Sequence, residues 1–258
     1  MNITKAVFFD VDGTLLPLGS KTVPQSTLNA ISKLKANGIF AVVATGRQID
    51  SYSKLPVNSI DFDAYIVANG TMLLDKNRKF IDGTPMEKQN LRQILNLLDE
   101  EKIAYALTVF GGRYINFIDE NVIRTHNQVQ TQPPEVGVYK GEDVYMIEAY
   151  LPQDRTQLLK RLQDFCTVAR WHESGVDIFS KTAGKAVGIE KFLNLHNLIK
   201  EEIIAFGDAE NDIQMLLYAG TGVAMGNADQ CVKDIADYVT DTVENNGVEK
   251  ALIRLGVL

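Results

Sequence analysis

The chain has 258 residues, of which 45% are hydrophobic and 23% are charged, and its formal net charge is −7. This is the composition of an ordinary globular protein that is long enough for one or two domains. The negative balance argues against broad nucleic-acid binding, because there is no surplus of Lys and Arg to contact a phosphate backbone. We expect no signal peptide, and the sequence has no apolar run that could span a bilayer, so we also expect no membrane partner.

Cysteine and histidine are scarce in this chain. Cys166 and Cys231 are too few to indicate a disulfide framework, which favours a reduced, cytoplasmic setting. Cys231 lies in a helix-like pattern, and we expect it to be packed. His126, His172 and His196 are scattered and lack metal-ligand spacing, so we expect each of them at or near the surface.

The first predicted strand ends in two aspartates. Five of the six residues from Ala6 to Val11 are apolar, which is typical of a central strand in a parallel sheet. Asp10 and Asp12 fall at the end of this run, and Gly13 allows a sharp turn. Ligands of open α/β sheets bind at the carboxyl ends of strands. A carboxylate pair at this place can bind a hard cation, and one carboxylate can attack an electrophile.

Strands and helices alternate over the next part of the chain. Pro24 suits the first turn of a helix that Gly38 ends. A second buried strand, 39–44, is followed by Thr45-Gly46-Arg47, and a third strand, 65–68, is followed by Asn69-Gly70. This order predicts a doubly wound, Rossmann-like parallel sheet.

The pattern changes near Asp82. An amphipathic helix over 91–98 precedes two strands, 104–109 and 114–118, with a hairpin turn at Gly111-Gly112. A polar stretch over 121–141 leads to further elements: a strand at 144–150, a helix at 158–162, and strands near 168 and 176–179. We therefore predict an α+β domain over 83–182, inserted into a core formed by 1–82 and 183–258.

The alternating pattern returns with a helix that begins at Lys185. A buried strand over 203–206 ends in Gly207-Asp208, and a short helix follows over 212–218. A strand at 223–225, a short strand at 238–239 and a helix over 248–255 complete the predicted core.

Four of these strand ends or helix starts carry residues suited to phosphoryl transfer: Asp10 with Asp12, Thr45, Lys185 and Asp208. A parallel sheet brings its strand ends to one edge, so we expect these residues to meet. Asp10 and Asp208 can hold Mg²⁺, which prefers carboxylate oxygens, phosphate and water. Thr45 and backbone N–H groups near Gly46 can donate to a phosphate oxygen.

These motifs resemble the haloacid dehalogenase (HAD) superfamily, in its Cof-like branch with a large α+β cap (subfamily IIB). The resemblance rests on Asp10-Val11-Asp12-Gly13-Thr14, Thr45-Gly46-Arg47, Lys185 and Gly207-Asp208-Ala209-Glu210-Asn211-Asp212, whose order and spacing cover nearly the whole chain. One departure is that Gly184-Lys185-Ala186 stands where the branch often has Lys-Gly. Lys181 therefore competes for the lysine role, but the helix that continues from Lys185 favours Lys185.

The resemblance implies a role for each matching residue. Asp10 would be the nucleophile, Asp12 the acid/base, and Thr45 and Lys185 would contact phosphate together with Gly46 and Arg47. Magnesium ligands would be Asp10, Asp208 and the main-chain carbonyl of Asp12, with Asn211 and Asp212 positioning Lys185, the metal or the phosphate. Asp12 favours an oxygen leaving group over a halide, because a halide needs no proton.

The function expected from these residues is Mg²⁺-dependent hydrolysis of a small phosphorylated metabolite, such as a sugar or cofactor phosphate, through an aspartyl-phosphate. A phosphomutase and a non-catalytic protein that binds a phosphorylated ligand remain alternatives. The cap would contact the leaving group, and its candidate residues are Arg113, Tyr114, Arg124, Glu173 and Asp177.

Overall fold

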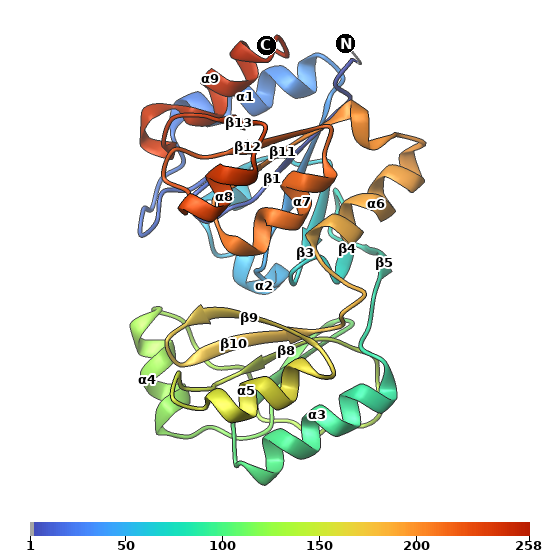
Figure 1. The fold of residues 1–258 in the computed structure, drawn as a ribbon, viewed down its shortest axis with the longest axis vertical. Helices are drawn as coiled ribbons and strands as arrows, with labels where there is room; N and C mark the ends of the chain where they lie inside the picture. The colour runs from blue at the N-terminus through green and yellow to red at the C-terminus, as the bar shows by residue number, and fades with distance from the viewer. Residues whose placement is uncertain (1–2) are drawn as a thin grey trace. The chain divides into compact units, whose positions relative to one another are not determined.

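A computed structural model describes residues 3–258 of the chain (Figure 1). Its internal contacts separate two compact units: one comprises the chain up to Gly83 together with 184–258, and the other comprises 84–183. Within residues 3–258, no helix combines the length and the apolar character that crossing a membrane requires.

The first unit contains an eight-stranded sheet with the strand order β13-β12-β11-β1-β2-β3-β4-β5. The strands from β13 to β3 are parallel to their neighbours, and β4 and β5 are antiparallel. Their bounds are β1 Ala6–Phe9, β2 Phe40–Ala44, β3 Ala64–Val67, β4 Met72–Asp75, β5 Phe80–Gly83, β11 Ile203–Gly207, β12 Thr221–Ala224 and β13 Tyr238–Val239.

Helices cover the parallel part of this sheet (Figure 1). Phe8 of β1 and Val42 of β2 share a buried apolar cluster with residues of α6, α7 and α8, while α1 packs against α9. The helices are α1 Gln25–Ala36, α2 Ile49–Tyr52, α6 Lys185–His196, α7 Ile213–Tyr218, α8 Gln230–Ile235 and α9 Gly247–Arg254, with short 3-10 turns at Pro56–Ser59, Lys200–Glu202, Glu210–Asp212 and Val243–Asn245.

Strand β1 occupies the topological switch point of the sheet. It is fully buried and pairs in parallel with β2 on one side and β11 on the other, so that Phe9 is level with both Val43 and Phe206. The carboxyl ends of these three strands therefore lie together at one edge. Ligands of open α/β sheets bind in the crevice at such a point. The predicted α/β fold class is confirmed.

The predicted third strand, β3, continues into a β-hairpin with β4. Ala68 and Asn69 both have positive φ, and the turn that they form leads directly into β4, which runs antiparallel to β3. Strand β5 then extends the sheet by one more antiparallel strand. We did not predict these two strands, because a short strand after a tight turn lacks a long apolar run of its own.

The second unit is an antiparallel sheet with the order β7-β6-β8-β10-β9. One face packs against α3 and α5, where Leu91, Leu95 and Leu158 join Leu107 and Ile147 of the sheet in an apolar core. The elements are α3 Lys88–Glu100, β6 Tyr105–Val109, β7 Gly112–Ile115, α4 Glu120–Gln128, β8 Val144–Ala149, α5 Thr156–Gln163, β9 Thr167–His172 and β10 Gly175–Phe179.

Four local predictions for the chain need correction. The hairpin between β6 and β7 turns at Phe110-Gly111, one residue before the predicted turn. The polar stretch over 121–141, for which we predicted no helix or strand, overlaps helix α4, which Asp119 caps by accepting a hydrogen bond from the Val122 N–H at 2.8 Å. Cys231 is exposed on α8 rather than packed, and His126 of α4 is buried rather than near the surface.

Candidate active site

Three functional side chains follow directly after the neighbouring strands β1, β2 and β11. Asp10 comes after β1, Thr45 after β2 and Asp208 after β11, and all three residues are buried. The Asp10 N–H donates to the Phe206 carbonyl at 3.0 Å, so the sheet register continues to the level of the site. The alignment of parallel strands thus brings together residues that are far apart in the sequence.

Lys185 is the first residue of α6, and its side chain is almost completely buried. Its ammonium group donates to Asp10 Oδ1 at 2.6 Å and to Asp212 Oδ1 at 2.6 Å. Lys181, the competing candidate, instead donates to the Asp164 carbonyl oxygen at 2.9 Å in the second unit. Of the two lysines, Lys185 is therefore the one that contacts Asp10.

Asp212 organises the loop after β11. Its Oδ2 accepts from the N–H of Asp208 at 2.9 Å and from the N–H of Ala209 at 3.1 Å, while its Oδ1 accepts from Lys185. Thr14 donates its hydroxyl to Asp208 Oδ1 at 3.0 Å. These hydrogen bonds hold the two carboxylates in fixed orientations beside the end of β1.

Gly13 allows the loop after β1 to approach Asp208 closely. Its φ is +84°, and a Cβ at this position would lie 2.1 Å from Asp208 Oδ2. Both the left-handed backbone and the lack of space exclude a larger residue. The glycine of the Asp10–Thr14 motif is therefore required by the fit between two loops as well as by the turn.

Asp12 forms a bidentate ion pair with Arg47. The Arg47 Nε donates to Asp12 Oδ2 at 2.6 Å, and its Nη2 donates to Oδ1 at 2.8 Å. Both side chains are about one-third exposed, at 34% for Asp12 and 36% for Arg47. Two parallel hydrogen bonds fix the position of the carboxylate.

Thr45, Gly46 and Asn211 lie in the same loops as these groups. The Thr45 Oγ1 accepts from the Arg47 N–H at 3.1 Å, so its own hydroxyl hydrogen is not used in this contact. The Asn211 amide donates to Asn69 Oδ1 at 3.3 Å, which links the loop after β11 to the turn after β3. A Cβ on Gly46 would lie 2.9 Å from Asn69 Oδ1, so a larger side chain would displace this link.

Asn227 is a residue of the site that we did not predict. Its amide nitrogen donates to the Gly13 carbonyl at 2.8 Å and lies 3.5 Å from Asp208 Oδ2, while its oxygen accepts from the Val243 N–H at 3.2 Å. It follows the carboxyl end of β12. Ligands bind at the carboxyl ends of parallel strands, and applying this rule to β12 would have identified Asn227 as well.

The site holds more negative than positive charge. Burial raises the pKa of Asp10 well above its ordinary value, although Lys185 opposes this change. Burial and the neighbouring Asp212 raise the pKa of Asp208 to about 7, although the hydrogen bond from Thr14 acts to lower it. Burial acts to lower the pKa of Lys185, but Asp10 and Asp212 together raise it above the ordinary lysine value. Lys185 thus remains charged and offsets only part of the repulsion.

The donor set fits a hard divalent cation. Oxygen atoms of Asp10, Asp208 and Asp212 all lie within 4.8 Å of one another, and all three residues are buried. The groups are carboxylates only, which suits Mg²⁺ rather than a metal that prefers sulfur or imidazole. A cation bound there would replace the protons that the crowded carboxylates otherwise retain.

The close approach of these three carboxylates predicts that Mg²⁺ stabilises the protein more strongly at high pH than at low pH. Asp208 binds a proton more tightly in the folded protein than in the unfolded chain, because its pKa rises from about 4 to about 7 on folding. In the metal-free protein its contribution to stability is therefore greatest below about pH 4, and this contribution is lost as the pH rises through about 7. Bound Mg²⁺ requires the ionised form, so its apparent affinity should weaken about tenfold for each pH unit below 7. The measurement is the melting temperature with Mg²⁺ and with EDTA from pH 5.5 to 8.5.

Two variants sharpen this measurement. Asp208→Asn should abolish the pH-dependent part of the Mg²⁺ effect, whereas Asp154→Asn, at an exposed position of the second unit, should retain it. An equal Mg²⁺ shift at every pH in the unmodified protein would contradict the proposed competition between protons and the cation.

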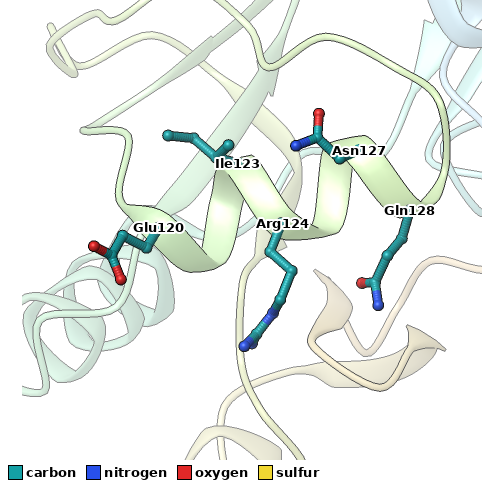
Figure 2. A pocket seen from close by; sticks show the side chains of 5 residues that line it. All are labelled: Glu120, Ile123, Arg124, Asn127 and Gln128. Atoms are coloured by element: carbon teal, nitrogen blue, oxygen red, sulfur yellow. The ribbon is translucent and has the colours of Figure 1, made fainter.

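The predicted cap residues do not all lie together. Arg124 lines a shallow surface hollow along α4 with other exposed residues of that helix (Figure 2). The Gln128 amide lies 3.5 Å from Glu173 Oε1, so Glu173 is at the same exposed region. Tyr114 packs against the core beneath α3 and α5. Arg113 and Asp177 are instead on the opposite face of the sheet, as their strand positions show.

Known proteins match this chain over nearly its full length. It is 31% identical over 270 residues to the pyridoxal phosphate phosphatase YbhA of Escherichia coli, covering 93% of this chain and 96% of that one. It is 30% identical over 268 residues to the 5-amino-6-(5-phospho-D-ribitylamino)uracil phosphatase YitU of Bacillus subtilis, covering 95% of each. The solved structure of BT1666, a HAD phosphatase of Bacteroides thetaiotaomicron, superimposes with a TM-score of 0.89 at 32% identity, covering 99% of this chain and 96% of that one.

The family match itself extends over residues 7–252, and it therefore includes every strand end that contributes to the site. The resemblance drawn from the sequence motifs is thereby confirmed, and the chain belongs to the haloacid dehalogenase-like hydrolase family.

Proposed function

We propose that this protein is a Mg²⁺-dependent phosphatase that hydrolyses phosphate monoesters of small metabolites through an aspartyl-phosphate. One observation carries the proposal: a buried carboxylate, Asp10, is oriented by Lys185 at 2.6 Å within a three-carboxylate cluster, and Asp12 lies two residues further on. Binding alone would need neither an oriented nucleophile nor a nearby acid/base. The relatives named as phosphatases support the same reaction class.

The first half of the reaction transfers the phosphoryl group to the protein. A carboxylate oxygen of Asp10 attacks phosphorus and forms a new P–O bond. The bond from phosphorus to the ester oxygen breaks, and its electron pair remains on that oxygen. Asp12 donates a proton to the departing oxygen, which leaves as an alcohol. Lys185 keeps the Asp10 carboxylate from rotating during the attack.

The second half returns the protein to its starting state. Asp12, now a carboxylate, removes a proton from a water molecule as that water attacks phosphorus. The bond between phosphorus and the Asp10 oxygen breaks, which releases inorganic phosphate and regenerates the carboxylate. One residue therefore acts as acid and then as base, and the proton that it gives to the alcohol is recovered from water.

Phosphate recognition uses groups that surround these two aspartates. Thr45 donates its hydroxyl hydrogen, and the Gly46 N–H and the Asn211 amide are further donors. Arg47 has two possible partners, because a phosphate dianion would compete with Asp12 for its guanidinium group. When Arg47 turns toward phosphate, its ion pair with Asp12 is weakened, and the Asp12 carboxyl group can turn toward the departing ester oxygen.

Asp10, Asp208 and the main-chain carbonyl of Asp12 would hold Mg²⁺, which when bound supplies positive charge that offsets repulsion between the carboxylates and the phosphate. Asp212 contributes differently. Both of its oxygens are engaged by Lys185 and by two backbone N–H groups, so it holds these partners in place.

The inserted domain, which the sequence predicts over 83–182, would determine which phosphate ester is accepted. Its chemistry is separate from that of the first unit, because the groups proposed for phosphoryl transfer all lie in the first unit. We therefore assign phosphoryl transfer to the core and choice of leaving group to the inserted domain.

The test is phosphate release by the metal-stripped protein from p-nitrophenyl phosphate and from a panel of phosphorylated metabolites, with and without added Mg²⁺. We expect turnover that depends on Mg²⁺ and that Ca²⁺ inhibits, since Ca²⁺ readily engages both oxygens of a carboxylate and would immobilise the attacking one. Activity that survives complete metal removal would contradict the proposal. Turnover that requires a bisphosphate activator and yields an isomeric phosphate would instead indicate a phosphomutase.

A further inference from the structure

The Asn227 side chain joins three loops of the first unit. Its amide nitrogen donates to the Gly13 carbonyl in the loop after β1, and it lies 3.5 Å from Asp208 Oδ2 in the loop after β11. Its amide oxygen accepts from the Val243 N–H, in the 3-10 turn after β13. Because the oxygen is anchored in this way, the nitrogen is held toward the other two loops.

The loop after β1 carries one of the proposed metal ligands, the main-chain carbonyl of Asp12. This carbonyl and the Gly13 N–H belong to one planar peptide group. The Gly13 N–H donates to the Leu16 carbonyl at 2.8 Å, so the Asp12 carbonyl points away from that oxygen. The following peptide group begins with the Gly13 carbonyl, which accepts from Asn227 at 2.8 Å. Hydrogen bonds therefore hold the peptide groups on both sides of Gly13.

Gly13 needs this restraint because of its conformational freedom. A glycine lacks Cβ and adopts many backbone conformations. No larger residue can replace it, since a Cβ would lie 2.1 Å from Asp208 Oδ2. The close approach of the two loops thus requires a flexible residue directly after Asp12. The hydrogen bond from Asn227 offsets that flexibility.

The second ligand beside Asn227 is the Asp208 carboxylate. Thr14 donates to its Oδ1 at 3.0 Å, and the Asn227 amide nitrogen lies on the side of Oδ2. The main chain of Asp208 is held by the same segment, because the Asp229 N–H donates to the Asp208 carbonyl at 3.1 Å. One amide group therefore lies between two proposed ligands that come from different strands, and it fixes one relative to the other.

We propose that Asn227 is a positioning residue that makes the cation site selective for Mg²⁺ over Ca²⁺. This inference rests on the proposed function, which assigns a cation to these ligands. Mg²⁺ requires near-octahedral geometry with short bonds, whereas Ca²⁺ accepts six to eight ligands in flexible geometry at longer distances. Ligands in fixed positions favour the more demanding ion. Ligands that can shift adapt to the larger ion, so loss of the Asn227 contacts should reduce the preference for Mg²⁺.

The test is calorimetric titration of the metal-stripped protein with Mg²⁺ and, separately, with Ca²⁺. In Asn227→Ala we expect Mg²⁺ affinity to fall by about ten- to a hundredfold, the usual effect of removing a group that orients a metal ligand. Ca²⁺ affinity should fall much less. Asn227 is exposed, so the melting temperature should change little. Equal weakening of both cations, or unchanged Mg²⁺ affinity, would overturn the inference.

Asn227→Asp is a second variant that keeps the shape of the side chain and its acceptor for the Val243 N–H. It lacks the donor to Gly13, and it adds a negative charge. That charge attracts both divalent cations, so the ratio of the two dissociation constants reports mainly on ligand geometry. We expect this ratio to move toward Ca²⁺, as in Asn227→Ala. A ratio equal to that of the unmodified protein would contradict the positioning role.

Thr240→Val is the structural control. It removes a buried hydrogen bond in the segment after β13, from the Thr240 hydroxyl to the Gly247 carbonyl at 2.8 Å, without changing a contact to Gly13 or Asp208. Its melting temperature should fall, and its preference for Mg²⁺ should persist. If this variant lost the preference as fully as Asn227→Ala does, general loosening of the fold would explain both results, and the inference would fail.

Turnover distinguishes this inference from the proposed function. If the unmodified protein releases no phosphate from p-nitrophenyl phosphate, the proposed function fails, and calorimetry still decides the inference. In the active protein, Asn227→Ala should raise the Mg²⁺ concentration for half-maximal activity, while turnover at saturating Mg²⁺ falls much less. Turnover lost at saturating Mg²⁺ with an unchanged Mg²⁺ requirement would overturn the inference even though the unmodified protein is a phosphatase.

Discussion

Replacing Asp10 with asparagine should lower the turnover number by about a thousandfold or more, the scale for removing a nucleophile that works as part of a unit. Asparagine keeps the shape of the side chain but lacks the anionic oxygen that attacks phosphorus. The measurement is phosphate release from p-nitrophenyl phosphate at saturating Mg²⁺. Because Asp10 and Asp212 share one buried lysine, removing one of the two negative charges should leave the fold intact.

The matched control for this variant is Asp154→Asn, which makes the same chemical change at an exposed position. It should retain full turnover. Circular dichroism and the melting temperature should show that the Asp10→Asn protein is folded. If that folded variant kept a tenth of the normal turnover, Asp10 could not be the nucleophile.

Asp12→Asn should reduce turnover by about a hundred- to ten-thousandfold for esters with poor leaving groups, the usual range for general acid–base catalysis. The loss should be smallest for p-nitrophenyl phosphate, because nitrophenolate needs little protonation as it leaves. A series of aryl and alkyl phosphates measures this dependence. Asparagine also removes the charge that pairs with Arg47, so the KM should change together with the turnover number.

Arg47→Gln separates these two effects. It removes the partner of Asp12 without removing the acid/base, so KM should rise while the dependence on leaving group persists. A loss in Asp12→Asn that is the same for good and poor leaving groups would be evidence against its role in proton transfer, provided that the same step limits both reactions.

Much of the core could be predicted, because its strands are marked by apolar runs that are visible in short stretches of sequence. The buried strand before Asp10, the strand before Thr45 and the strand before Asp208 are each continuous apolar runs, and parallel sheets place such runs side by side. Helix α4 and the hairpin of β4 and β5 were harder to predict. The first is short and mostly polar along its exposed face, and the second follows a turn formed by two non-glycine residues with positive φ.

The contacts within the site depend on partners that the sequence does not specify. Thr45 and Asp208 could be placed near Asp10 from the strand order alone, but the engagement of Lys185 with both Asp10 and Asp212 requires the exact position of α6. Asn227 was missed, although it follows the strand that was predicted at 223–225.

The amino-acid sequence by itself determined which residues stand at strand ends and in what order, because apolar periodicity and turn residues act over short distances along the chain. Only the tertiary structure decided which of them touch. The pairing of Arg47 with Asp12, and of Arg113 with Glu148, joins residues on different strands or loops. Such pairs depend on strand register and on packing, and these are set by the combined burial of many side chains rather than by any local pattern.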